Sequence, residues 1–147
     1  MSISAYKNTI RQVESPRQIE RRILSRLTGE LEAFGAYDTT TTSFERLDIL
    51  ANGLRDALIE NQTFWAALKH DLAHPTNALP PELRAGLLSI ALWVDQKTKN
   101  VLGGQPGVMA LVEINRSIIA GLAATPAAHP PAAVAPVAVA QPAYQGR

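Results

Sequence analysis

Residues that start and stop helices divide this chain into segments whose apolar side chains recur at helical spacing, and this pattern constrains the fold most. Ser15 can cap a helix, Pro16 suits the first helical position, and Gln18 completes a capping box. Apolar residues then recur every three or four positions as far as Phe34, and Gly35 is placed to end the segment. We therefore expect a helix over this stretch.

A second capping box, made by Thr42 and Glu45, predicts another helix after a loop rich in threonine. Its apolar residues are expected along one stripe, formed by Phe44, Leu47, Leu50, Ala51, Leu54 and Leu58. Asn61 can cap a separate helix that ends near His74, because Pro75 disfavours helical geometry in the residue before it. A loop from residue 73 to 80 follows.

Three more segments have a helical period. Pro81 opens a strongly apolar helix that runs to about Leu102 and stops at two glycines, and a last helix covers about residues 108–122. Residues 3–13 form a shorter amphipathic candidate, with one apolar side made by Ile3, Tyr6, Ile10 and Val13.

The end of the chain has a different composition. Residues 123–147 are largely Ala, Pro and Val without a usable period, which predicts a disordered tail. No segment shows consistent two-residue alternation between turn residues. We therefore expect an all-α protein, with a domain at residues 1–122 that forms an irregular bundle of five or six helices, followed by the tail.

Composition excludes several classes of protein. The net charge of +1 gives no basic excess of the kind that drives nonspecific binding to nucleic acids, so direct RNA contact is disfavoured. The chain has no cysteine, no secretion signal and no apolar run long enough to span a bilayer. These features predict a cytoplasmic protein that does not enter membranes.

Catalytic and metal-binding motifs are lacking. The sequence has no glycine-rich phosphate loop and no nucleophile elbow. His70 and His74 have the spacing of zinc-protease ligands, but Asp71 stands where that motif has its glutamate neighbour, and Pro75 ends the helix. We expect no enzyme activity, no cofactor and no metal.

The segment from Pro81 to Leu102 is apolar around most of its circumference. A single core on one side of the helix cannot bury all of these side chains. One interpretation is a central helix surrounded by the others. The alternative is a groove that receives an amphipathic helix of a partner, with Trp93 as an anchor.

Two polar features also allow two interpretations. Asn115 falls within an apolar stripe, where its amide needs either an internal hydrogen bond or a ligand. Arg17, Arg21 and Arg22 lie close together on one predicted helix and suggest phosphate contact. Their angles, however, straddle the borders of the apolar stripe, which is typical of a solvated helix boundary.

Three sequence blocks stand out by their order and spacing. They are Ser15 to Gln18 with Glu20, Asp71 to Pro75 with Asn77 to Pro80, and Leu111 to Ile118. Together they resemble the FlaF family of bacterial flagellar biosynthesis proteins, over about residues 3–122. The last block is the most specific, and the tail lies outside the resemblance.

This resemblance implies a role in the synthesis and export of flagellin, the filament subunit. FlaF-like proteins are thought to act as secretion chaperones of flagellin, together with FlbT, a regulator that acts on flagellin messenger RNA. The expected partners are therefore flagellin, FlbT and the flagellar export apparatus. Export requires release, so a groove with a few anchors and moderate affinity is expected.

The first hypothesis is a flagellin-binding export chaperone needed for filament assembly. Its predicted contacts are Trp65, Leu92, Trp93, Asn115, Arg116 and Ile118. The alternative is a post-transcriptional regulator of flagellin expression that works through FlbT or on flagellin mRNA, with contacts at Arg17, Arg21 and Arg22.

Overall fold

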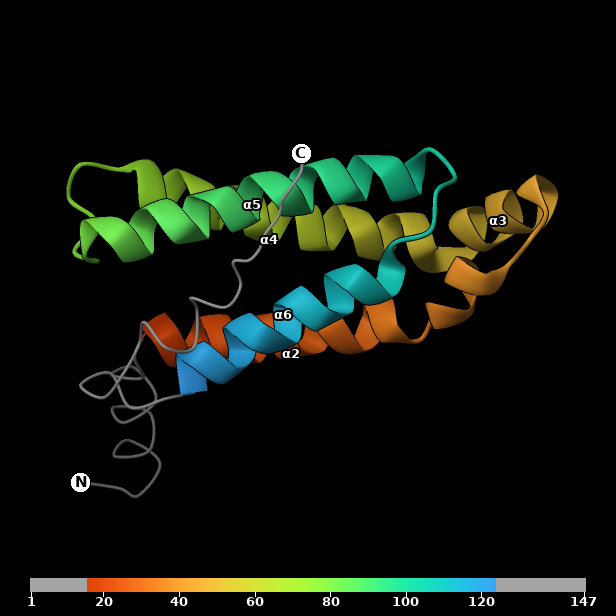
Figure 1. The fold of residues 1–147 in the computed structure, drawn as a ribbon. Coiled ribbons are helices and arrows are strands. Elements are labelled where there is room, and N and C mark those ends of the chain that lie inside the picture. Colours follow the sequence, from red (N-terminus) through yellow and green to blue (C-terminus); the bar gives the residue numbers. More distant parts are fainter. Residues whose placement is uncertain (1–15, 124–147) are drawn as a thin grey trace, which may run out of the picture.

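The computed structural model describes residues 16–123, and every regular element in this range is helical (Figure 1). Four helices of 16 to 22 residues form the body, namely α2 (Pro16–Glu32), α4 (Arg55–Ala73), α5 (Pro81–Leu102) and α6 (Val108–Ala123). The all-α prediction is confirmed, but the described range has four main helices where five or six were predicted.

Three short elements connect α2 to α4. They are a 3-10 helix, η1 (Gly35–Thr39), the seven-residue α3 (Ser43–Ile49) and a π-helical turn, η2 (Leu50–Leu54). The predicted helix at residues 3–13, the Ser15 cap and the predicted tail from residue 124 lie outside the described residues.

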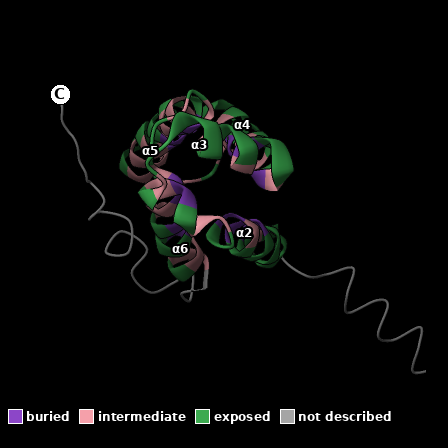
Figure 2. Ribbon diagram, turned by 90° about the vertical axis from the view of Figure 1, so that its right-hand side faces the viewer, coloured by how far each residue is buried: buried purple, intermediate pink, exposed green. Residues whose placement is uncertain are grey.

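The four long helices form two stacked pairs. In Figure 1, α4 and α5 lie together above α2 and α6, and the end view in Figure 2 places α4 over α2 and α5 over α6. Helix α2 packs mainly on α6, and α4 packs mainly on α5. The core therefore lies between two helical pairs, of which α4 and α5 form a hairpin, whereas α2 and α6 come from the two ends of the described range.

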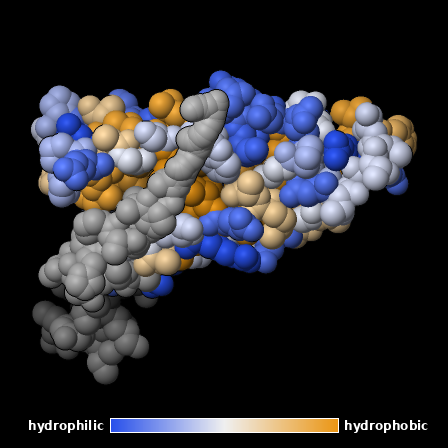
Figure 3. All heavy atoms as spheres, in the orientation of Figure 1, coloured by the Kyte–Doolittle hydropathy of each residue, from blue (hydrophilic) through white to orange (hydrophobic). Residues whose placement is uncertain are grey.

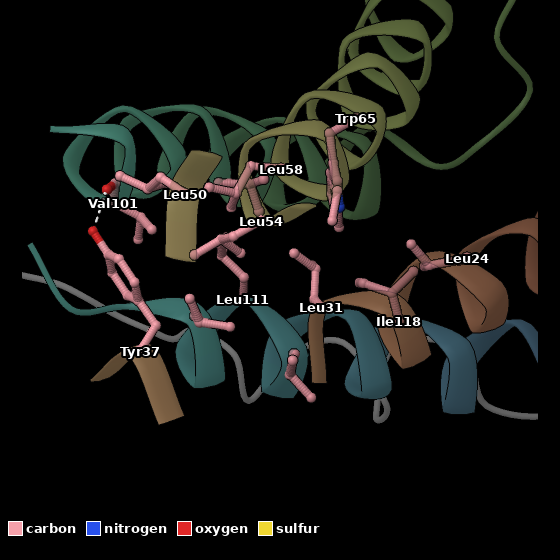
Figure 4. Close-up of a cluster of buried hydrophobic side chains, with 14 of the residues drawn as sticks. Leu24, Leu31, Tyr37, Leu50, Leu54, Leu58, Trp65, Val101, Leu111 and Ile118 are labelled. Atoms are coloured by element: carbon pink, nitrogen blue, oxygen red, sulfur yellow. Dashed lines mark hydrogen bonds between the residues drawn. The ribbon is translucent and has the colours of Figure 1, made fainter. Parts of the chain in front are cut away.

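Apolar side chains from all four long helices fill this core. Those drawn in Figure 4 include Leu24 and Leu31 of α2, Leu58 and Trp65 of α4, Val101 of α5, and Leu111 and Ile118 of α6. Each is at most 7% exposed. Burying such a side chain contributes roughly 1.5–3 kcal/mol to folding, which explains why the apolar stripes face one another.

Several predicted boundaries are confirmed. Helix α5 spans Pro81–Leu102, and α6 begins at Val108. Thr42 caps α3, because its Oγ1 accepts a hydrogen bond from the Glu45 N–H at 3.2 Å. Cap and breaker residues therefore locate these helix ends correctly.

The predicted break at Asn61 is wrong. Helix α4 runs through this position without interruption, and Asn61 is fully buried inside the bundle. The chain bends instead at Asn52 and Gly53, where Gly53 has a φ of 126°. Glycine adopts such angles without a steric penalty, so this is where the helical geometry changes.

Two side chains of η1, which follows α2, form hydrogen bonds with α5 and with the start of α6. The Tyr37 hydroxyl donates a hydrogen bond of 2.8 Å to the Val101 carbonyl of α5 (Figure 4). The neighbouring Asp38 accepts three backbone N–H groups at the start of α6, from Gly107, Val108 and Met109. This cap, which the sequence analysis did not identify, fixes where α6 begins.

Candidate interaction surfaces

The outer face of α5 carries two large apolar side chains that the bundle does not cover. Leu92 is 59% exposed and Trp93 is 39% exposed. The Lys97 Nζ lies 5.5 Å from the centre of the Trp93 ring, which is a cation–π distance. Because Ala91 and Val94 face inward, α5 has one buried side and is not surrounded by the other helices.

Polar contacts hold this face of α5 in place. The Gln62 side chain of α4 donates a hydrogen bond of 3.1 Å to Asp95 Oδ1, and Lys99 Nζ lies 2.9 Å from Asp95 Oδ2. These two contacts, led by the one from Lys99, lower the pKa of the Asp95 carboxyl. The Gln62 hydrogen bond joins α4 to α5, and with α5 in this orientation Leu92 and Trp93 are exposed.

Three of the predicted contact residues are buried. Trp65 is 2% exposed, Asn115 is fully buried and Ile118 is 7% exposed. The Trp65 Nε1–H donates to Asn115 Oδ1 at 2.9 Å, and the Asn115 amide donates to Asn61 Oδ1 at 2.8 Å. Asn115 therefore has the internal partners that its place in an apolar stripe requires, and these residues are not accessible to a partner in this conformation.

Arg116 lies apart from the outer face of α5. Its side chain is about half exposed and forms an ion pair with Glu32 of α2. Among the six predicted contacts, only Leu92 and Trp93 lie together on an exposed surface, whereas Trp65 and Asn115 meet inside the core.

A second apolar surface lies on α3, at one end of the molecule. Phe44 is 80% exposed and Leu47 is 59% exposed, and no residue of α3 is buried. Figure 3 shows apolar residues at this end and also between the two helical pairs. We call Phe44 and Leu47 the α3 surface.

Helix α3 turns its cation inward and its apolar side chains outward. Arg46 Nη1 donates a hydrogen bond of 2.8 Å to the Gly104 carbonyl, and its guanidinium lies 5.6 Å from the centre of the Tyr37 ring. The prediction that Phe44 and Leu47 lie along one stripe of a single helix with Leu58 is therefore wrong. The bend at Gly53 separates α3 from α4, and that glycine was the sequence feature that could have revealed it.

Comparison with known families agrees with the all-helical architecture. The family model of the flagellar protein FlaF matches residues 2–122. The chain belongs to the FlaF family. No curated protein and no solved structure matches it. The match covers the described helices up to residue 122, and it also includes residues 2–15.

The arginines of the alternative hypothesis lie on α2 of this FlaF-family chain. Arg21 and Arg22 are exposed, whereas Arg17 is partly buried near Glu20. The pKa of Glu20 is raised from its ordinary value of 4.5, first by partial burial and second by the Asp71 carboxylate, while Arg17 acts in the opposite direction. An acidic group therefore lies among these cations.

Two further findings concern residues 16–123 of the FlaF-family chain. Within this range no group of three or more His, Asp or Glu side chains is arranged to hold a metal ion. His74 lies just after α4, and its ring contacts Thr76. No helix in the range is both long and apolar enough to cross a membrane.

Proposed function

We propose that this FlaF-family protein binds unpolymerised flagellin in the cytoplasm and acts as its export chaperone, with the outer face of α5 as the principal contact. The observation that carries this proposal is the exposure of Leu92 and Trp93 on a helix that polar contacts hold in place. Aromatic and large aliphatic side chains are typical anchors of protein interfaces.

Chaperone action of this kind requires a surface that covers the apolar stripe of another helix. An amphipathic partner helix places its apolar residues every three or four positions, and two neighbouring anchors can engage such a stripe. Lys97 beside Trp93 adds a cation at the edge of the contact. A small anchor set favours moderate affinity, which allows flagellin to be released for export.

The α3 surface is the second candidate contact for flagellin. Phe44 and Leu47 are 80% and 59% exposed. Because Arg46 points inward, the charged neighbours of these two residues within α3 are the acidic Glu45 and Asp48. Helix α3 and the outer face of α5 can be tested separately, because changes on either surface leave the buried core intact.

The deciding experiment is calorimetric titration of unpolymerised flagellin into three forms of the full chain. These are the unchanged protein, the Leu92→Asp/Trp93→Ala variant and the Phe44→Asp/Leu47→Asp variant. We expect saturable binding to the first, and a loss of at least about tenfold in affinity, or about 1.4 kcal/mol, for the α5 variant. Ala120→Asp, at an exposed position of α6, is the control and should bind normally.

Other outcomes would redirect the assignment. Weakened binding by the Phe44→Asp/Leu47→Asp variant alone would move the contact to α3. If flagellin gives no heat but FlbT or flagellin leader RNA does, the chaperone proposal fails and the regulator hypothesis takes its place. Loss of a salt-sensitive RNA complex in Arg21→Glu would then support direct contact by α2.

A further inference from the structure

One side of the bundle, formed by α2 and α4 (Figure 2), leaves apolar side chains incompletely covered. Ile19 and Ile23 lie one turn apart on α2 and are 38% and 37% exposed. On α4, Phe64 is partly buried and Ala67 is exposed. These two residues are also about one turn apart. We call these four residues the α2/α4 seam.

Charged residues at both ends fix the register of the seam. Arg26 Nη1 of α2 lies 3.8 Å from Glu60 Oε2 of α4. Farther along, Glu20 of α2 lies near enough to Asp71 of α4 for the two carboxylates to interact. The seam residues of α4 follow Glu60 at i+4 and i+7, so they fall between these contacts on the same face. The seam is therefore an apolar strip between charged ends.

The end of the seam beside Glu20 is acidic. Partial burial disfavours the ionised form of Glu20, and repulsion from Asp71 adds to this effect. Arg17 compensates only in part, since the net shift of the Glu20 pKa is still upward. A further cation next to this pair would favour both carboxylates in their ionised form.

The chain immediately before α2 has the complementary chemistry. Residues 3–13 carry an apolar stripe made by Ile3, Tyr6, Ile10 and Val13, with Lys7 and Arg11 beside it. Such a helix is about 16 Å long, which matches three turns of α2. Only Glu14 and Ser15 separate this segment from Pro16, so it is tethered close to the start of α2. The FlaF family match includes this segment, since it begins at residue 2.

We propose that residues 3–13 dock as an amphipathic helix in the α2/α4 seam of the same chain. Their apolar side chains pack against the seam residues, and Lys7 and Arg11 lie beside Glu20 and Asp71. This docking closes one side of the bundle. Among the large apolar side chains of residues 16–123, it leaves Ile59, the outer face of α5 and the α3 surface exposed, so the inference is independent of whether flagellin is the partner.

The absence of cysteine from the chain allows a direct test with engineered pairs. In full-length Tyr6→Cys/Ala67→Cys, the first cysteine lies in the segment and the second in the seam. The control is Tyr6→Cys/Ala85→Cys, whose second cysteine replaces an exposed alanine of α5. In a glutathione redox buffer, we expect the seam pair to show at least about a tenfold higher effective concentration than the control pair. Equal values for the two pairs would overturn the proposal.

Hydrogen exchange gives a second test without cysteines. In the full chain, Asp71→Lys should speed exchange of the amides of residues 3–13 by at least about tenfold, since it replaces attraction to Lys7 and Arg11 with repulsion. Asp56→Lys, which changes an exposed carboxylate at the other end of α4, should leave that exchange unaltered. Identical exchange of these amides in all three proteins would contradict docking, whatever flagellin binding shows.

Discussion

The carboxylate of Asp38 accepts three backbone N–H groups of the α6 start, at 2.8 to 2.9 Å, although about 70 residues separate the partners. Loss of a helix cap costs about 0.5–2 kcal/mol, and charged acceptors lie at the upper end of this range. Asp38→Ala should therefore lower the free energy of unfolding by about 2 kcal/mol in urea titrations. Asp38→Asn should lose less, because its amide oxygen can still accept. Equal losses in both variants would show that the charge, and not the acceptor geometry, is responsible.

The buried pair of Trp65 and Asn115 gives a second prediction for a single residue. Asn115→Ala removes the acceptor of the Trp65 N–H and the donor to Asn61, which leaves buried polar groups without partners. The expected loss of stability is about 2–4 kcal/mol, measured by chemical denaturation. The exposed Ser117→Ala on the same helix should change stability by less than about 0.5 kcal/mol. A small effect of Asn115→Ala would mean that water replaces the amide.

Glu20 and Asp95 should give opposite pH dependences. The folded state raises the pKa of Glu20, so it binds this proton more tightly than the unfolded state, and stability falls as pH rises above 4.5. Glu20→Gln should therefore match the unchanged protein below pH 4.5 and exceed its stability at neutral pH. The lowered pKa of Asp95 predicts the reverse for Asp95→Asn, which should be less stable at neutral pH. Thermal unfolding between pH 3 and 7 measures both, and a parallel response of the two variants would refute the assignment.

At the scale of elements, the bend before α4 depends on one glycine. A Cβ at Gly53 would lie 2.8 Å from the Phe34 ring, and the φ of 126° is strained for any other residue. Gly53→Ala should cost more than about 1 kcal/mol. Gly29→Ala is the matched control, because its Cβ would meet nothing within 4 Å inside α2, and it should stabilise the protein by about 0.5–1 kcal/mol. Urea titration of both variants checks the pair, and a neutral Gly53→Ala would show that the bend can relax.

Helix ends with strong local chemistry were predictable, and those set by distant contacts were not. Thr42 and Pro81 act within one helical turn, so the sequence shows them directly. Asparagine often caps helices, yet the Asn61 amide oxygen accepts a hydrogen bond from Asn115, 54 positions away, and α4 continues through Asn61. Tertiary contacts override local preference in such cases.

The same distinction applies to the candidate surfaces. The excess of apolar residues on α5 left two interpretations open, and the exposure of Leu92 and Trp93 decides against a helix surrounded by the others. Periodicity could not separate Trp65 from Trp93, because both belong to apolar stripes and only the packing partners differ. The α3 surface was missed because a stripe read through Gly53 assumes one straight helix.

At the scale of the whole molecule, two stacked helical pairs supply the core, and the core residues described above all lie within residues 16–123. The family match stops at residue 122, and the described residues end at Ala123. Removal of residues 125–147 should therefore shift the midpoint of thermal unfolding by less than about 2 °C, since no core residue is lost. Calorimetry of the shortened and full chains measures this. A drop of about 5 °C or more would mean that the end of the chain packs on the bundle.

The two tryptophans of this chain occupy opposite environments, one enclosed and hydrogen-bonded, the other on the outer face of α5. Their ultraviolet emission should therefore separate into a short-wavelength component shielded from dissolved quenchers and a longer-wavelength component open to them. The first reports on the integrity of the core, and the second on occupation of the outer face. The native protein thus contains two optical probes, which distinguish unfolding from partner docking without any attached label.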